Sequence, residues 1–175
     1  MIQPLSRLLL RLTMILGLTL FITGCGFQLR GDNTATALPP SWQQMSLVTA
    51  NPNSEFSREV QARFSANGIV WVGKDEAAYI LKLGPEGFSQ RNLSLNAEAR
   101  AAEFELTMKT NFSVLSASGT EEIGNSDAIV IKQMENDPRN VVGKSEEVRI
   151  LKTEMRTELA QQIMRRIGFY AASTQ

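Results

Sequence analysis

The strongest constraint on the fold is a strict alternation of side chains in the stretch AEFELTMKTNFSVLS, residues 102–116. Successive side chains of a β-strand point to opposite faces of the sheet. The pattern therefore predicts an antiparallel strand with one buried face and one face in water. One parity holds Phe104, Leu106, Met108, Phe112 and Val114, and the other holds Glu105, Thr107, Lys109, Asn111 and Ser113.

Shorter strand signals flank this segment, at residues 44–50, 77–97 and 128–134. The second is interrupted by glycine and proline at 84–87, which indicates a bulge, a plain turn or a loop that reaches a partner. Ser54 can cap a helix over 54–66 whose apolar residues recur every four positions. Another helix is expected from Ser145 to Gly168, with one apolar stripe formed by Val148, Leu151, Met155, Leu159, Ile163 and Ile167.

The resulting order, β-α-β-β-β-α, predicts an α+β fold. A two-layer α/β sandwich, with a four-stranded sheet and both helices on one face, buries all of these apolar stripes. The domain is expected over 42–170, followed by a C-terminal tail over 171–175. Trp42 and Trp71 lie beside strands, so they are expected to pack within this domain rather than at a membrane interface.

Composition excludes several classes of function. The chain of 175 residues has no histidine, which rules out Ser-His-Asp triads, Cys-His dyads and imidazole metal ligands. A single cysteine rules out an intrachain disulfide or a cysteine-rich zinc site. Lys plus Arg and Asp plus Glu balance at 18 each, so a nucleic-acid binder is not expected. No metal site, no organic cofactor and no enzymatic activity are expected.

The N-terminus has the parts of a secretory signal. Arg7 and Arg11 precede an apolar run over 12–22 that is short for a membrane-spanning helix. Ile22-Thr23-Gly24-Cys25 then resembles the bacterial lipobox. We therefore expect a signal peptide over 1–24, and a lipidated N-terminus and tether over 25–41. The alternatives are an uncleaved helix or an incidental cysteine.

The resemblance to lipoproteins implies N-palmitoyl and S-diacylglyceryl groups on Cys25. Anchoring by more than one acyl chain is effectively permanent. Gly26 after the cysteine resembles the sorting signal for the cell outer membrane.

The whole chain resembles the LptE family of LPS-assembly lipoproteins. The resemblance is carried by CGFQLRG directly after the lipobox, by LPPSWQQMSL, by REVQARFSANGI and by the β-β-β-α remainder. It implies a plug in the lumen of the outer-membrane barrel LptD, with the domain on the periplasmic side and in the barrel. Binding lipopolysaccharide, assisting its insertion at the outer leaflet and assisting the assembly of LptD are the implied roles. The alternative is a structural or chaperone-type envelope lipoprotein without lipopolysaccharide contact.

Lipopolysaccharide offers phosphates and acyl chains, so cations near apolar surface are the candidate binding residues. Lys144 matches a basic position of the family, six residues after Pro138, and Arg139 lies in the same loop. The family also has a functional arginine in the hairpin flanked by Arg91 and Arg100, and Arg100 is the nearer candidate. Each of these residues has the alternative of an ordinary solvated charge. Arg91, Arg100, Lys109 and Lys132 could line one side of the sheet, or be scattered over the surface.

Overall fold

The computed structural model describes residues 38–97, 99–136 and 141–174. The expected signal peptide, Cys25, most of the tether and Arg139 therefore lie outside the described residues. Within them, a 3-10 helix, η3 (Pro40–Trp42), precedes the first strand. The remaining elements follow in the order β1 (Gln44–Thr49), α2 (Glu55–Ser65), β2 (Val70–Trp71), β3 (Tyr79–Leu83), β4 (Gly87–Leu95), β5 (Ala101–Ser116), β6 (Glu121–Glu135) and α3 (Val141–Ser173).

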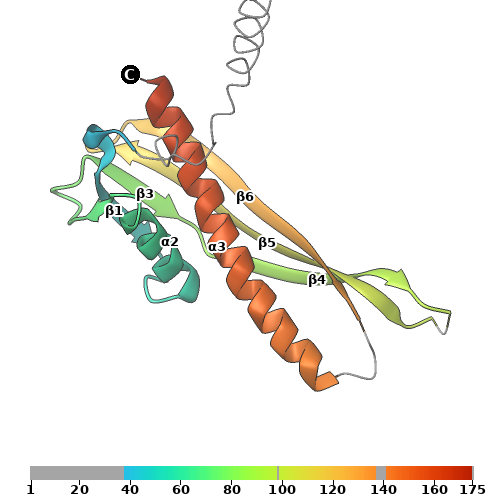
Figure 1. Ribbon diagram of the computed structural model, residues 1–175. Helices are drawn as coiled ribbons and strands as arrows, with labels where there is room; N and C mark the ends of the chain where they lie inside the picture. The colour runs from blue at the N-terminus through green and yellow to red at the C-terminus, as the bar shows by residue number, and fades with distance from the viewer. Residues whose placement is uncertain (1–37, 98, 137–140, 175) are drawn as a thin grey trace, which may run out of the picture. The chain divides into compact units, whose positions relative to one another are not determined.

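The described strands form one mixed sheet around β5 (Figure 1). β1 is parallel to both β2 and β3, as a connection through α2 requires. β3 and β4 are antiparallel to β5 and follow one another along the same edge of that strand. β6 is antiparallel to the opposite edge of β5. The expected α+β class is confirmed, but the sheet has six strands where the sequence predicted four.

The extra strands have local causes. β2 has only two residues, too few for an alternating pattern to reveal it. The stretch 77–97 divides because Gly84 lies directly on β5. The Gly84 N–H donates to the Asn111 carbonyl at 2.8 Å, and a Cβ at Gly84 would meet Asn111 Oδ1 at 1.9 Å. Pro85 then supplies no N–H for pairing. The break is therefore a close approach of two backbones rather than an open loop.

Helix α2 forms as predicted. Ser54 caps it, since its Oγ accepts the Ser57 N–H at 3.0 Å. Phe56, Val60 and Phe64 are fully buried on the face toward the sheet. Gly68 follows the helix with φ of +89°, a conformation that favours glycine.

Helix α3 is longer than predicted at both ends. It begins at Val141 rather than Ser145, and it passes through Gly168 to Ser173. Glycine inside a helix costs about 1 kcal/mol relative to alanine. Packing beyond Gly168 offsets this cost, because Ala171 is buried and the Tyr170 hydroxyl donates to Glu122 Oε2 at 3.0 Å.

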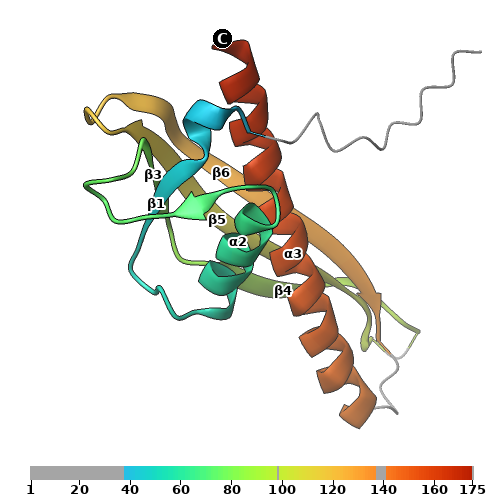
Figure 2. The ribbon, with the colours of Figure 1, turned by 60° about the vertical axis from the view of Figure 1, so that its left-hand side comes forward.

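Both helices cover the same face of the sheet and lie side by side (Figure 2). The even-numbered side chains of β5 from Phe104 to Val114 are buried beneath them, which confirms the predicted alternation. The last four residues of the predicted α3 stripe are fully buried in the same core: Met155, Leu159, Ile163 and Ile167. The two-layer arrangement is therefore confirmed.

Both tryptophans pack within the domain, as expected. Trp42 is buried, and its ring stacks on Tyr79 with centroids 3.7 Å apart. Trp71 is half-buried beside Phe64, and its indole N–H donates to the Gln61 carbonyl at 3.1 Å.

Candidate functional site

Lys144 lies inside helix α3, as the fourth residue of that helix. The expectation that the helix begins at Ser145 is therefore wrong. The Lys144 ammonium instead sits 4.0 Å from the centroid of the Phe104 ring on β5. A cation over an aromatic face is held electrostatically and also lies beside apolar surface. Lys144 is half-buried in this position, so one side of its charge stays accessible.

Arg91 is engaged across the sheet with Glu105. The guanidinium donates from Nε and Nη2 to the two carboxylate oxygens at 2.6 and 2.9 Å. The hydrogen bond from Arg91, followed by its charge, lowers the pKa of the Glu105 carboxyl below its usual range. The side chain of Arg91 is still 68% exposed. A phosphate at Arg91 would therefore compete with a carboxylate already in place.

Arg100 lies at the base of the turn that joins β4 and β5. Its backbone N–H donates to Asn96 Oδ1 at 2.9 Å, and Asn96 N–H in turn donates to the Arg100 carbonyl at 2.8 Å. Ala99 before it adopts φ of +58°, a left-handed conformation that is uncommon for a residue with a Cβ. Arg100 is exposed. The structure thus separates Arg100, at the base of the turn, from Arg91, on strand β4.

The group formed by Arg91, Arg100, Lys109 and Lys132 does not line one side of the sheet. Arg91 and Lys109 share the face that is not covered by helices, because they pair in register with Glu105 and Gly87. Lys132 points to the helix-covered face, where it contacts Glu154 at 3.1 Å and Glu158 at 2.6 Å. These contacts, the hydrogen bond from Glu158 foremost, raise the pKa of Lys132.

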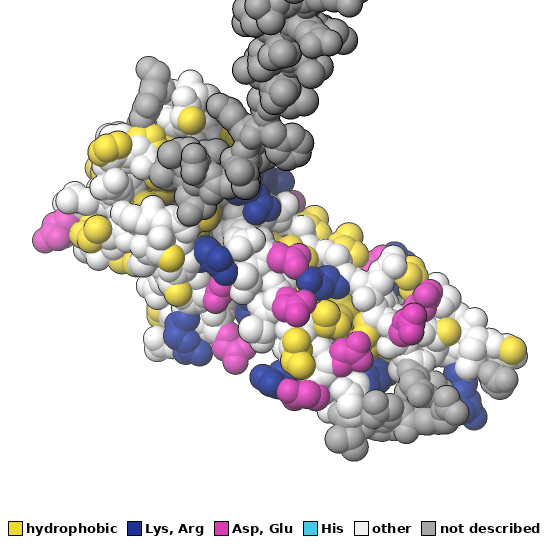
Figure 3. All heavy atoms as spheres, in the orientation of Figure 1, with side chains coloured by type: hydrophobic (Ala, Val, Ile, Leu, Met, Phe, Trp, Pro, Cys, Tyr) yellow, Lys and Arg dark blue, Asp and Glu magenta, His cyan; other side chains and the backbone are white. Residues whose placement is uncertain are grey.

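The sequence alone indicates which face of the sheet Lys132 lies on. Lys132 shares its parity with Ala128, Val130 and Met134, which are all buried. Figure 3 shows acidic and basic side chains intermixed along the surface of α3, rather than a block of one sign.

The face of the sheet away from the helices, which we call the open face, is polar along β5. Thr107, Lys109, Asn111 and Ser113 lie on it, as the alternation predicted. Two shallow hollows of about 340 and 360 Å³ adjoin the Gly84–Gly87 break and share Asn111 and Asn125. The Asn111 Nδ2 donates to Asn125 Oδ1 at 3.1 Å between them. Ile129 and Ile131 of β6 are exposed beside these polar groups.

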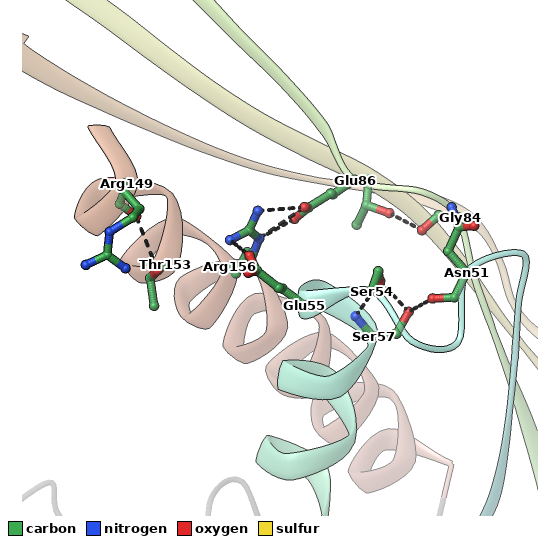
Figure 4. Close-up of polar contacts among 10 residues, drawn as sticks. Asn51, Ser54, Glu55, Ser57, Gly84, Glu86, Arg149, Thr153 and Arg156 are labelled. Atoms are coloured by element: carbon green, nitrogen blue, oxygen red, sulfur yellow. Dashed lines mark hydrogen bonds and ion pairs between the residues drawn. The ribbon is translucent and has the colours of Figure 1, made fainter. Parts of the chain in front are cut away.

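An ion network that the sequence did not indicate joins α3, α2 and the β3–β4 break at Arg156 (Figure 4). Its Nε and Nη2 donate to the Glu86 carboxylate at 2.8 and 2.9 Å, and Nη1 contacts Glu55 at 2.5 Å. The hydrogen bond to Glu86 is the main reason that the pKa of Arg156 is raised. Arg156 is only 16% exposed, so it holds the β3–β4 break against both helices.

A family of known proteins matches this architecture. The model of the family LptE, described as lipopolysaccharide-assembly, matches residues 42–167, which is more than half of the chain. The chain belongs to the LptE family. An LPS-assembly lipoprotein LptE from Photorhabdus laumondii is 27% identical over 158 residues, covering 89% of this chain and 84% of the relative. A second, from Yersinia pestis, is 28% identical over 159 residues, covering 89% and 74%.

Solved structures agree with the LptE assignment. The crystal structure of rare lipoprotein B from Shewanella oneidensis is 26% identical with a TM-score of 0.66, covering 75% of this chain and 98% of that one. The solution structure of a lipoprotein B from Nitrosomonas europaea has a TM-score of 0.70 at 20% identity, covering 84% and 93%. The second likeness supports the fold alone.

LptE membership makes the chain an LPS-assembly lipoprotein associated with the outer membrane, and not an enzyme. Lipoproteins of this family carry no cofactor, which confirms that expectation. In the described part of the chain, no helix combines the length and apolar character needed to cross a bilayer. No group of three or more potential metal ligands occurs among the described residues.

Proposed function

We propose that this LptE family member is the plug of an LptD barrel. In this role it binds lipopolysaccharide, assists its insertion at the outer leaflet and assists the assembly of LptD. The observation that carries the proposal is the polar open face of the sheet. Neither helix covers Thr107, Lys109 and Asn111 on this face. Barrel lumens are polar, so a domain lodged in one needs hydrogen-bonding side chains on its outer surfaces.

Photo-crosslinking tests this placement. A crosslinking amino acid at Lys109 or Asn111 is expected to capture a large barrel protein in living cells, because both side chains are exposed on the open face. Capture of only small soluble proteins would instead favour a structural or chaperone-type envelope lipoprotein that does not contact lipopolysaccharide.

The proposed anchor is Cys25, acylated after removal of residues 1–24. Such an anchor holds the domain at the periplasmic side of the outer membrane, from which it enters the barrel lumen. Two or more acyl chains make this attachment stable, since each buried methylene contributes about 0.8 kcal/mol.

The proposed lipopolysaccharide-binding residues are Lys144, Arg139, Arg100 and Arg91. Lys144 has the strongest support, because its ammonium lies over the Phe104 ring, where a phosphate and an acyl chain could be met together. Lys144→Asp is expected to weaken binding of purified lipopolysaccharide several-fold. Lys74→Asp is the matched control, since Lys74 is an exposed lysine between β2 and β3. Equal binding by both variants would remove Lys144 from the site.

A further inference from the structure

The two long outer strands of the sheet differ in how their free edges are closed. β6 and β4 each pair only with β5 among the described strands. Side chains of helix α3 occupy the middle of the β6 edge, at Asp127 and Ile129. Gln162 Oε1 accepts the Ile129 N–H at 3.1 Å, and Arg166 Nη1 donates to the Asp127 carbonyl at 2.6 Å. Side chains that occupy edge groups in this way prevent another strand from pairing there.

These contacts also fix the direction of the main-chain groups on β4. Since the Ile129 N–H points away from β5, Ile129 and its partner Lys109 do not exchange main-chain hydrogen bonds. The main-chain groups of odd-numbered β5 residues therefore point toward β3 and β4. Two bonds confirm this direction, from the Gly84 N–H to the Asn111 carbonyl at 2.8 Å and from the Ala117 N–H to the Ala78 carbonyl at 2.9 Å.

It follows that alternate residues of β4 present free main-chain groups. Residues 87, 89 and 91 lie opposite the odd-numbered residues of β5 and bond to them. The N–H and C=O groups of Phe88, Gln90 and Asn92 point outward instead. Within the described ranges, no hydrogen bond reaches these outward groups. A register shift after Asn92 marks the end of the regular edge.

The regular part of β4, from Gly87 to Asn92, has neither of the residues that most often protect an edge strand. Lysine and proline, which natural proteins place on edge strands to prevent pairing, do not occur in the segment GFSQRNLSL, residues 87–95. Arg91 is tied back to Glu105 of β5. Residues 89–93 are all exposed. Figure 1 shows β4 along the border of the sheet, on the side of β5 opposite to β6.

We propose that the edge of β4 from Gly87 to Asn92 binds an extended main-chain segment of the LptD barrel by strand addition. The identity of this partner rests on the proposed function, whereas the mode of pairing rests on the geometry of β4. Strand addition draws affinity from main-chain hydrogen bonds and specificity from alternate side chains. The wall strands of a closed barrel are paired on both sides. The segment must therefore come from a loop or another part that folds into the lumen.

The positive charge of Lys152, beside β4, predicts the residue type at one position of the bound segment. The Lys152 ammonium lies 4.1 Å from the centroid of the Phe88 ring, on the helix-covered side of β4. Among the described residues it has no ion-pair partner within 4.0 Å. The residue of the bound segment that lies opposite Phe88, on the helix-covered side, is therefore expected to be Asp or Glu, whose negative charge would pair with Lys152. A second copy of this chain, paired antiparallel about Gln90, would place neutral Asn92 there instead.

Residue-resolved hydrogen exchange tests the pairing. The full-length chain is compared in detergent with the same chain in the complex purified from solubilised outer membranes. The amides of Phe88, Gln90 and Asn92 are expected to exchange rapidly in the free chain and at least ~10-fold more slowly in the complex. The amides of Ser89 and Arg91 are expected to be slow in both states, because they bond to β5.

A proline variant gives an independent test. Gln90→Pro removes one outward N–H that has no partner in the described chain, and edge positions of this kind tolerate proline. The amount of barrel protein that co-purifies with the Gln90→Pro chain is expected to fall at least ~10-fold. Gln90→Ala keeps the N–H and is expected to leave this amount unchanged. A circular-dichroism melt establishes that both variants are folded. If the proline variant does not fold, hydrogen exchange on the unmodified chain still decides the matter.

The outcomes separate this proposal from the proposed function. If the barrel co-purifies while the three outward amides exchange rapidly in the complex, the pairing is overturned and the plug function stands. If no barrel co-purifies with the unmodified chain, the proposed function itself fails. Protection that accompanies a doubled mass of this chain would identify a second copy as the occupant and overturn the assignment to LptD.

Discussion

Replacing Arg156 tests whether the ion network holds the β3–β4 break to the helices. Arg156→Met keeps an apolar stem of similar length and removes the guanidinium. A hydrogen bond to a charged group contributes about 1.5–3 kcal/mol, but the Glu86 carboxylate is 23% exposed and partly screened. The contact with Glu55 adds little, because that side chain is 66% exposed. We expect the free energy of unfolding to fall by about 2 kcal/mol.

The assay is urea denaturation of the purified protein, with the midpoint and slope both fitted. The matched control is Arg149→Met on the same helix, whose pair with Glu146 is exposed on both sides. This control should leave the free energy of unfolding nearly unchanged, because water and salt screen an exposed ion pair. The double variant Arg156→Met, Glu86→Gln should be less destabilised than the sum of the single changes, because it leaves no unpaired carboxylate. A loss at Arg156 no larger than at Arg149 would refute the argument.

Three further expectations concern the break, the exposed ion pair and the anchor. Gly84→Ala should destabilise the fold by about 1 kcal/mol, since its Cβ would overlap Asn111 Oδ1, and Asn111→Ala should relieve part of the loss in urea denaturation. The lowered pKa of Glu105 should move up in Arg91→Gln when its carboxyl is titrated by NMR. A lowered folded-state pKa means that this pair stabilises the fold above the ordinary carboxyl pKa and loses that effect as pH falls through the lowered value. An unchanged titration would contradict the pairing. Cys25→Ser should abolish labelling by a palmitate analogue and block signal removal, and persistent labelling would contradict acylation at this residue.

The sequence predicted the elements whose signal is local. The alternation over 102–116 identified β5 and its buried face, because burial of one face demands period two. The capping position of Ser54 and the spacing of Phe56, Val60 and Phe64 identified α2 in the same way. Both signals depend only on residues within one element.

The missed features depend on contacts between distant residues. The Gly84–Gly87 break was visible in the sequence, but its outcome depends on the approach of Gly84 to Asn111 on another strand. The early start of α3 involves Lys144, which meets Phe104 on β5. Valine and glycine at 141–143 are poor helix formers, so propensity gave no reason to begin the helix there.

The candidate site shows the same limit. Arg91 was identified as a cation, but its engagement by Glu105 follows from the β4–β5 register, which the sequence does not specify. The Arg156–Glu86 pair joins residues 70 positions apart. The direction of Lys132, like that of Lys109, was within reach of the sequence, through the buried residues that alternate with it or share its parity.

Native mass spectrometry of the detergent-solubilised outer membrane tests the central claim most directly. The chain is captured through a C-terminal tag and analysed without denaturation. The account predicts a complex that contains the LptD barrel and this chain, beginning at Cys25 and heavier by its acyl groups. Recovery of this chain alone, with an unmodified cysteine and no barrel protein, would contradict it.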